Sequence, residues 1–224
     1  MKLQLVLSRR RFAVWLLRLI VLLAVFSVSA QFDFSAQLLV KIQTKYGQEA
    51  YNRVAQWQEL MLAAKHLPEQ DKLIQVNDFF NRNIQFVDDI YLWDVKDYWA
   101  TPLETLIKGA GDCEDYSIAK YFTLKELGVS DDKMRITYVK ALKLNQAHMV
   151  LTYFAAPRAV PVVLDNLVAD IKPATQRTDL LPVYSFNGSG LWLAKSRGSG
   201  KKVGDSTRLN MWTELKQRML NEAI

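Results

Sequence analysis

The sequence has 224 residues, with 29 lysines and arginines against 23 aspartates and glutamates, and its formal net charge at pH 7 is +6. Residues 1–30 hold five of the basic residues and no acid, so the remaining chain carries 24 − 23 = +1. Domains that bind nucleic acid normally keep a basic patch in their folded part. The charge distribution therefore argues against a nucleic-acid-binding protein.

Residues 1–30 have the composition of an export signal. Basic residues come first, an apolar run ending at Val28 follows, and Ser29-Ala30 supplies the small residues that a signal peptidase requires. An uncleaved membrane anchor is the alternative, but residues 12–28 are barely long enough to span a bilayer and an arginine interrupts them. We expect a signal peptide over residues 1–30, a periplasmic location, and one domain over residues 31–224.

Helical spacing of apolar residues dominates the first half of the chain. Residues 33–64 read as one or two helices, Pro68 ends that region, and residues 69–83 form another amphipathic helix. A loop rich in aromatic and acidic residues, DDIYLWDVKDYWATP, then leads to the stretch GAGDCEDYSIAKY. A further helix is predicted from Asp112 onward, with Gly128 as its stop.

The second half changes to the two-residue period of β-strands. The segments RITYVKALKL, AHMVLTYFAA and AVPVVLDNL each predict a strand, residues 182–193 predict one or two more, and residues 207–220 predict a closing helix. Helices followed by an antiparallel sheet indicate an α+β fold. A basic cluster in and directly before the Gly/Ser stretch SRGSGKKVGDS is interpreted as a solvated mobile loop; its members are Lys195, Arg197, Lys201 and Lys202.

Cys113 is the single cysteine of the sequence, and it lies between Asp112 and the pair Glu114-Asp115. A thiol in the first turn of a helix meets unpaired backbone N–H groups, which favour the thiolate, whereas the three carboxylates oppose it. The alternative is a small buried hydrophobe beside ordinary helix-start acids, because free cysteines are usually buried. The stretch by itself leaves both interpretations open.

Two residues on neighbouring predicted strands make a catalytic role for Cys113 plausible. His148 lies inside AHMVLTYF, and Asp165 follows the apolar residues of the next strand, where a carboxylate needs a partner such as an imidazole. The other histidine, His66, precedes a proline and is expected in a surface loop. The candidate triad is Cys113 as nucleophile, His148 as base and Asp165 as orienting acid.

The segments GDCEDYSIAKYFTLKELG, AHMVLTYF and VLDNL resemble the bacterial transglutaminase-like cysteine proteinases, over residues 57–192. The resemblance implies a papain-like or transglutaminase-like α+β core, with helices before an antiparallel sheet and the catalytic cysteine at a helix N-terminus. It assigns Cys113, His148 and Asp165 the roles of nucleophile, base and orienting acid.

The same resemblance implies calcium dependence, with Asp112, Glu114 and Asp115 as the ion-binding acids. A divalent cation would cancel much of the repulsion among these carboxylates and explain why they surround a thiol. Calcium takes six to eight oxygen ligands, so backbone carbonyls and water would have to complete the site. Without the resemblance, three acids that lack the EF-hand spacing are a weak calcium signal.

Three functions remain as hypotheses. The resemblance implies a calcium-dependent periplasmic cysteine endopeptidase that cuts the N-terminal region of a giant surface adhesin and so releases biofilm cells. It also implies restraint by an inner-membrane receptor that senses cyclic di-GMP. A transglutaminase or amidase is the second hypothesis, because the same triad serves acyl transfer to an amine. The third is a catalytically inactive calcium-dependent binding module, against which the complete triad argues.

Overall fold

The computed structural model describes residues 36–194 and 200–222, so the predicted export signal lies outside the described residues and stays a prediction. The described part of the chain begins with three helices, α2 (Ala36–Tyr46), α3 (Gln48–Ala64) and α4 (Glu69–Asn83). These helices confirm the prediction, made from the spacing of apolar residues, of helices within residues 33–64 and over residues 69–83. The break between α2 and α3 falls at Gly47, whose φ of 88° lies in the left-handed region that glycine adopts without strain.

Between α4 and the cysteine the structure adds elements that the periodicity did not predict. They are β1 (Gln85–Phe86), α5 (Asp89–Leu92), α6 (Pro102–Lys108) and β2 (Ala110–Gly111). A capping box starts α6: Glu104 N–H donates to Thr101 Oγ1 (3.1 Å), and Thr101 N–H donates to Glu104 Oε2 (2.8 Å). β1 pairs in parallel with β2, which fixes the backbone directly before the cysteine.

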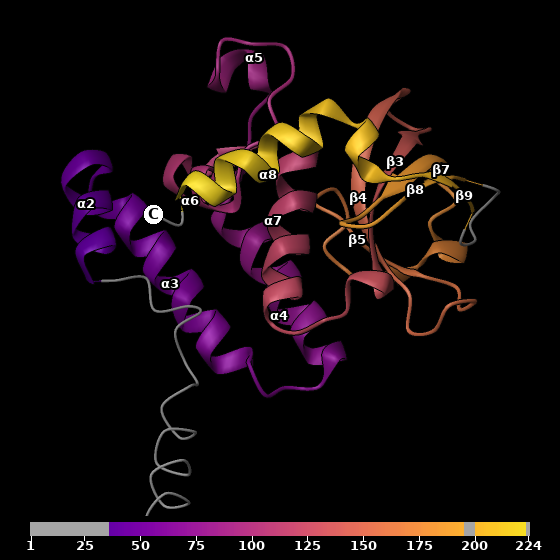
Figure 1. Ribbon diagram of the computed structural model, residues 1–224, viewed down its shortest axis with the longest axis horizontal. Helices are drawn as coiled ribbons and strands as arrows, with labels where there is room; N and C mark the ends of the chain where they lie inside the picture. Colours follow the sequence, from indigo (N-terminus) through magenta and orange to yellow (C-terminus); the bar gives the residue numbers. More distant parts are fainter. Residues whose placement is uncertain (1–35, 195–199, 223–224) are drawn as a thin grey trace, which may run out of the picture. The chain divides into compact units, whose positions relative to one another are not determined.

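The central helix of the fold is α7 (Cys113–Glu126), which confirms the helix predicted from Asp112. Asp112 is the residue that precedes its first turn, and the chain leaves the helix through Gly128, with a φ of 86°. Ile118, Tyr121 and Leu124 are fully buried, because α7 packs against both α4 and the sheet. Figure 1 shows α7 between the N-terminal helices and the sheet.

The described strands of the second half form one seven-stranded sheet in the order β6-β5-β4-β3-β7-β8-β9, and all its neighbours are antiparallel. This arrangement confirms the α+β fold class. The bounds are β3 (Met134–Ala141), β4 (Gln146–Tyr153), β5 (Val162–Leu164), β6 (Lys172–Pro173), β7 (Leu180–Phe186), β8 (Leu191–Leu193) and β9 (Lys201–Gly204).

The interpretation of SRGSGKKVGDS as a mobile loop is wrong for its second half. Lys201 and Lys202 belong to β9 and pair with Leu193 and Trp192 of β8, while Lys195 and Arg197 lie outside the described residues. The Lys202 ammonium also lies 5.5 Å from the centre of the Trp192 ring. A neighbouring strand therefore orders a segment whose own composition predicts a loop.

The closing helix α8 (Asn210–Glu222) confirms the predicted C-terminal helix. It packs over α7, because Trp212 is fully buried and its ring stacks on Phe122 at 5.3 Å (Figure 1). Three short 3-10 turns complete the described structure: Asp131–Lys133, Ala174–Gln176 and Ser206–Arg208. None of the helices in residues 36–194 and 200–222 has the length and apolar composition needed to cross a membrane.

Candidate active site

Cys113 is the first residue of α7, and it is half-buried against β4. Its thiol donates to Glu114 Oε2 at 3.0 Å, and its sulfur accepts the backbone N–H of Met149. The approach to this helix start requires a glycine. A Cβ on Gly111 would lie 2.6 Å from Asp115 Oδ2 and 2.7 Å from Asp115 Cβ, closer than atoms in proteins pack. Together, the β1–β2 pairing and Gly111 place the thiol beside Met149, the residue that follows His148.

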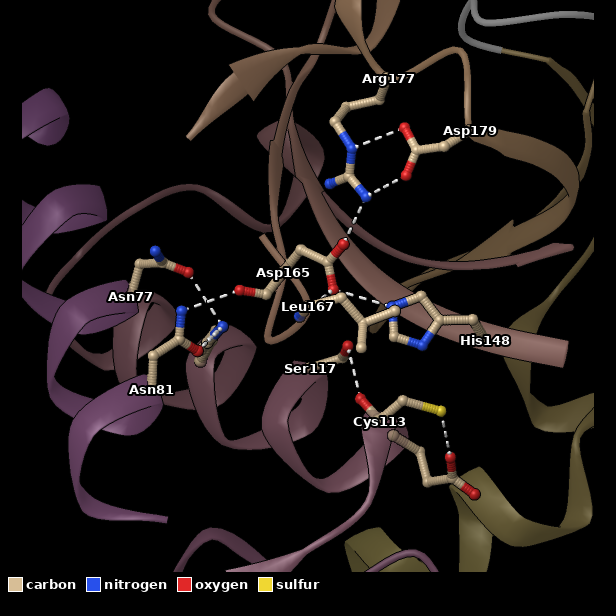
Figure 2. A network of polar contacts seen from close by, with 11 residues as sticks. Asn77, Asn81, Cys113, Ser117, His148, Asp165, Leu167, Arg177 and Asp179 are labelled. Carbon is tan, nitrogen blue, oxygen red and sulfur yellow. Dashed lines mark hydrogen bonds and ion pairs between the residues drawn. The ribbon is translucent and has the colours of Figure 1, made fainter. Parts of the chain in front are cut away.

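Strand register brings His148 and Asp165 together. Leu164 of β5 pairs with Leu151 of β4, so the next residue, Asp165, reaches the part of β4 that holds His148. His148 Nε2 and Asp165 Oδ1 are 2.8 Å apart, and the two residues are 3 % and 1 % exposed. Figure 2 shows the second ring nitrogen, Nδ1, directed toward the sulfur of Cys113. The three residues of the candidate triad thus converge. His66 lies on the surface, as expected.

Asp165 is held as an anion. Burial by itself would raise the pKa of this carboxyl, but the hydrogen bond with His148, the backbone N–H of Leu167 and the Arg177 guanidinium hold the pKa below its usual value. The Leu167 N–H donates to Oδ1 at 3.1 Å, and Arg177 Nη2 lies 2.7 Å from Oδ2. The imidazole therefore faces a negative charge on the side away from the cysteine.

A cavity of about 510 Å³ opens in front of Cys113 and His148. Trp99 lines it and stacks on Phe186 with ring centres 5.4 Å apart, while Tyr138 and Tyr184 stack on each other at 5.1 Å. Ligand sites typically combine an apolar lining with a few convergent polar groups. This cavity has that composition, because aromatic side chains, the thiol, the imidazole and carboxylates all line it.

Five carboxylates gather beside the thiol. Oxygens of Asp89, Asp112 and Asp115 lie within 4.8 Å of one another, and so do oxygens of Asp89, Asp97 and Glu114. Asp115 has a structural part in this cluster, because its Oδ1 accepts from Ala100 N–H (2.8 Å) and its Oδ2 from Asp112 N–H (3.3 Å). Both of its oxygens thus tie the loop before α6 to the start of α7.

The cluster is unfavourable without a cation. Burial, then the charges of Glu114 and Asp115, raise the pKa of Asp112 to about 10. Burial also raises the pKa of Asp89 to about 6, against a hydrogen bond from Tyr98 N–H. The thiol is affected in the same direction, since burial and then Glu114 raise the pKa of Cys113. In this electrostatic setting the Cys113 side chain is a protonated thiol.

A hard cation fits this cluster. Asp89 Oδ1 and Asp112 Oδ1 are buried and have no hydrogen-bond partner among the described residues, so each has a lone pair available to an ion. Oxygen-rich sites of several carboxylates suit Ca²⁺. Asp112, Glu114 and Asp115 were expected in this cluster from the resemblance, whereas Asp89 and Asp97 were not. The signal for these two was the concentration of acids in DDIYLWDVKDYW.

The fold and the site define a class of protein. A cysteine at a helix start, facing a histidine–aspartate pair on an antiparallel sheet, is the arrangement of the papain-like and transglutaminase-like cysteine proteases. Residues 39–192 match the family model described as bacterial transglutaminase-like cysteine proteinase BTLCP. The chain belongs to this family.

Solved structures agree with this assignment. Legionella pneumophila LapG, in a structure from EGTA-treated protein, is 43% identical, with a TM-score of 0.71 over 81% of this chain and 97% of LapG. Calcium-bound LapG of the same organism is 42% identical, with a TM-score of 0.68 over 81% of this chain and 98% of LapG. A search of proteins with curated functions found no match.

Proposed function

We propose that this chain is a calcium-dependent cysteine endopeptidase in which Cys113, His148 and Asp165 are the catalytic residues. The observation that carries the proposal is the buried His148–Asp165 pair, with the free imidazole nitrogen directed at the family's cysteine at the start of α7. Family membership supports cysteine protease activity.

The arrangement supports the following steps. His148 Nδ1 takes the thiol proton of Cys113, and the thiolate attacks the carbonyl carbon of the substrate peptide. Asp165 accepts the Nε2–H of the imidazole, which selects the correct tautomer and stabilises the imidazolium. His148 then returns the proton to the leaving amine, so that an acyl-enzyme remains on Cys113. A water molecule, activated by the same imidazole, hydrolyses the acyl-enzyme and restores the thiol.

Glu114 competes with His148 for the thiol proton, because the thiol donates to Glu114 at 3.0 Å. The residues that would hold calcium are Asp89, Asp97, Asp112 and Glu114, with Asp115 bracing the loop. Bound calcium would supply the positive charge that neutralises these carboxylates. With its charge neutralised, Glu114 would no longer oppose ionisation of Cys113, and His148 would be the acceptor of the thiol proton. The similarity to a LapG that was solved with calcium supports this assignment.

For the biological setting we propose the periplasm, with the N-terminal region of a giant LapA-type adhesin as substrate, so that cleavage releases cells from a biofilm. An inner-membrane LapD-type receptor of cyclic di-GMP is the proposed inhibitory partner. Support comes from the similarity to LapG and from the predicted export signal. A binding assay with the periplasmic domain of such a receptor tests the partner, and unchanged cleavage rates at saturating receptor would exclude it.

The decisive experiment incubates residues 31–224 with the N-terminal domain of an adhesin from the same cell, in calcium and in EGTA. We expect one new fragment in calcium, none in EGTA, and none with Cys113→Ala. A fluorescent primary amine in the same reaction distinguishes the alternatives. Incorporation of the amine without a new fragment would identify a transglutaminase. A Cys113 that iodoacetamide fails to label in calcium would favour an inactive binding module.

A further inference from the structure

The carboxylate of Asp165 has two different neighbours, one on each oxygen. Oδ1 is occupied by His148 Nε2 (2.8 Å) and Leu167 N–H (3.1 Å), whereas Oδ2 lies 2.7 Å from Arg177 Nη2. Arg177 is 3 % exposed, so this ion pair is shielded from water. Figure 2 shows Arg177 at one carboxylate oxygen of Asp165 and His148 at the other.

Arg177 is itself held rigidly. Its Nε donates to Asp179 Oδ1 (3.0 Å) and its Nη2 to Asp179 Oδ2 (2.8 Å), a two-point contact that fixes the plane of the guanidinium. Its backbone is fixed as well, since its N–H donates to Ala174 O (3.2 Å) and its carbonyl accepts from Leu180 N–H (3.2 Å). Arg177 therefore presents Nη2 to Asp165 from a fixed position between β6 and β7.

A second cation near Asp165 has a different place. Lys120 is buried on α7, but its ammonium donates to the side-chain oxygens of Asn77 (2.9 Å) and Asn81 (2.7 Å). Asn81 in turn donates to the backbone carbonyl of Asp165 at 2.8 Å. Lys120 thus supports the main chain of Asp165, whereas Arg177 contacts the carboxylate itself.

The contact has a geometric consequence. A carboxylate bound on one side alone can rotate about its Cβ–Cγ bond and exchange its two oxygens, and the hydrogen bond to the imidazole rotates with it. A cation fixed on the opposite oxygen prevents that rotation. We propose that Arg177 is a positioning residue that holds Oδ1 of Asp165 on His148 Nε2, and so keeps Nδ1 directed at Cys113. This inference rests on the endopeptidase proposed above.

The competing explanation is structural, in which Arg177 does no more than compensate the charge of a buried aspartate. The two roles differ in a double-mutant cycle, because a residue that acts through Asp165 has nothing left to position once Asp165 is changed. The variants are Arg177→Met, Arg177→Lys and Asp165→Asn, with Arg177→Met/Asp165→Asn as the double variant. Arg82→Met is the control, because it removes an arginine from an exposed ion pair with Asp78.

Two readouts are measured on residues 31–224 in calcium. The first is the second-order rate of alkylation by iodoacetamide, which reports on Cys113 alone because the sequence has one cysteine and which requires no substrate. The second is kcat and KM for cleavage of the adhesin N-terminal domain. Melting temperatures are recorded for every variant.

We expect Arg177→Met to lower kcat and the alkylation rate about 10- to 100-fold with little change in KM, because a misplaced catalytic group costs up to about 100-fold in rate. Arg177→Lys should lie between wild type and Arg177→Met, because a single ammonium cannot replace the planar fork that binds both carboxylates. In the Asp165→Asn background, Arg177→Met should add less than about a twofold effect. Arg82→Met should match the wild type.

Equal fold-losses from Arg177→Met in the wild-type and Asp165→Asn backgrounds would overturn the inference, as would wild-type rates in Arg177→Met. If Arg177→Met does not fold, Asp179→Asn and Arg177→Lys decide, and wild-type alkylation rates in both would refute the positioning role. The remaining outcome is that Arg177→Met lowers the alkylation rate only when Asp165 is present, while the wild type cleaves no adhesin. This result would support the positioning role and reject the proposed substrate.

Discussion

Calcium binding should release about one proton or more from this protein at pH 7. Asp112 has its pKa raised to about 10, chiefly by burial and by Glu114, so it is almost fully protonated at pH 7. Asp89, with a pKa raised to about 6 by burial, is about one-tenth protonated at that pH. An ion that binds their oxygens requires the deprotonated carboxylates, so it must displace these protons. The calcium affinity should therefore rise about tenfold per pH unit between pH 7 and pH 9.

Isothermal titration calorimetry measures this release directly. Calcium is titrated into residues 31–224 in Pipes, Hepes and Tris at pH 7, and the slope of the binding enthalpy against the buffer ionisation enthalpy equals the number of protons released. Asp112→Asn is the matched variant, because it keeps the shape of the side chain and removes its titration. We expect its slope to fall by about one proton relative to the wild type.

A slope near zero in the wild type, together with measurable calcium binding, would refute the reasoning. The carboxylates would then already be ionised before the metal arrives, so burial and the neighbouring charges would not raise the pKa of Asp112 to about 10. The readout is independent of proteolysis, so it tests the electrostatics of the cluster even if the substrate assignment fails.

Three further outcomes are expected. Cys113→Ala and His148→Ala should each lower kcat by several orders of magnitude with little change in melting temperature, and more than about a hundredth of wild-type activity would contradict the triad. Burial lowers the pKa of Lys120 from 10.5 to about 7, so between pH 7 and 10 the unfolded chain binds more protons than the folded protein. The free energy of unfolding of the wild type should therefore rise with pH relative to that of Lys120→Met. The rise is at most about 5 kcal/mol in urea unfolding, and a difference independent of pH would contradict it. Gly111→Ala should lower the free energy of unfolding by about 1 to 3 kcal/mol and weaken calcium binding, because its Cβ would lie 2.6 Å from Asp115 Oδ2. A wild-type calcium affinity in this variant would contradict the expectation. Gly47→Ala, whose Cβ would meet no atom within 4 Å, should keep the wild-type calcium affinity.

Local pattern was sufficient for most of the elements. The bounds of α4 and the start of α7 agree with the periodicity of their apolar residues, and the β3–β4 hairpin agrees with the two-residue alternation on either side of Asn145, whose φ of 53° marks the turn. The capping box of α6 is local as well, as Thr101-Pro-Leu-Glu104, although no helix was predicted there from the sequence. These features depend on neighbours within a few residues, which is why a linear reading reaches them.

Residues that act through distant partners required the tertiary structure. Asp89 and Asp97 approach Glu114 because the segment between α4 and α6 folds back over the start of α7. Arg177, which lies between β6 and β7, reaches Asp165, which directly follows β5. β9 is ordered by its pairing with β8, against its own composition.

The sequence by itself determined the chemical groups of the site: one thiol at a helix start, one histidine on a strand, an aspartate after the next strand, and acids on both sides of the thiol. The tertiary structure decided which of them touch. The pairing of Leu164 with Leu151 sets Asp165 against His148. Gly111, which has no side chain, leaves room for the carboxylate of Asp115. Hydrogen-bond geometry and charge interactions act over a few ångströms of space, and no spacing along the chain specifies those distances.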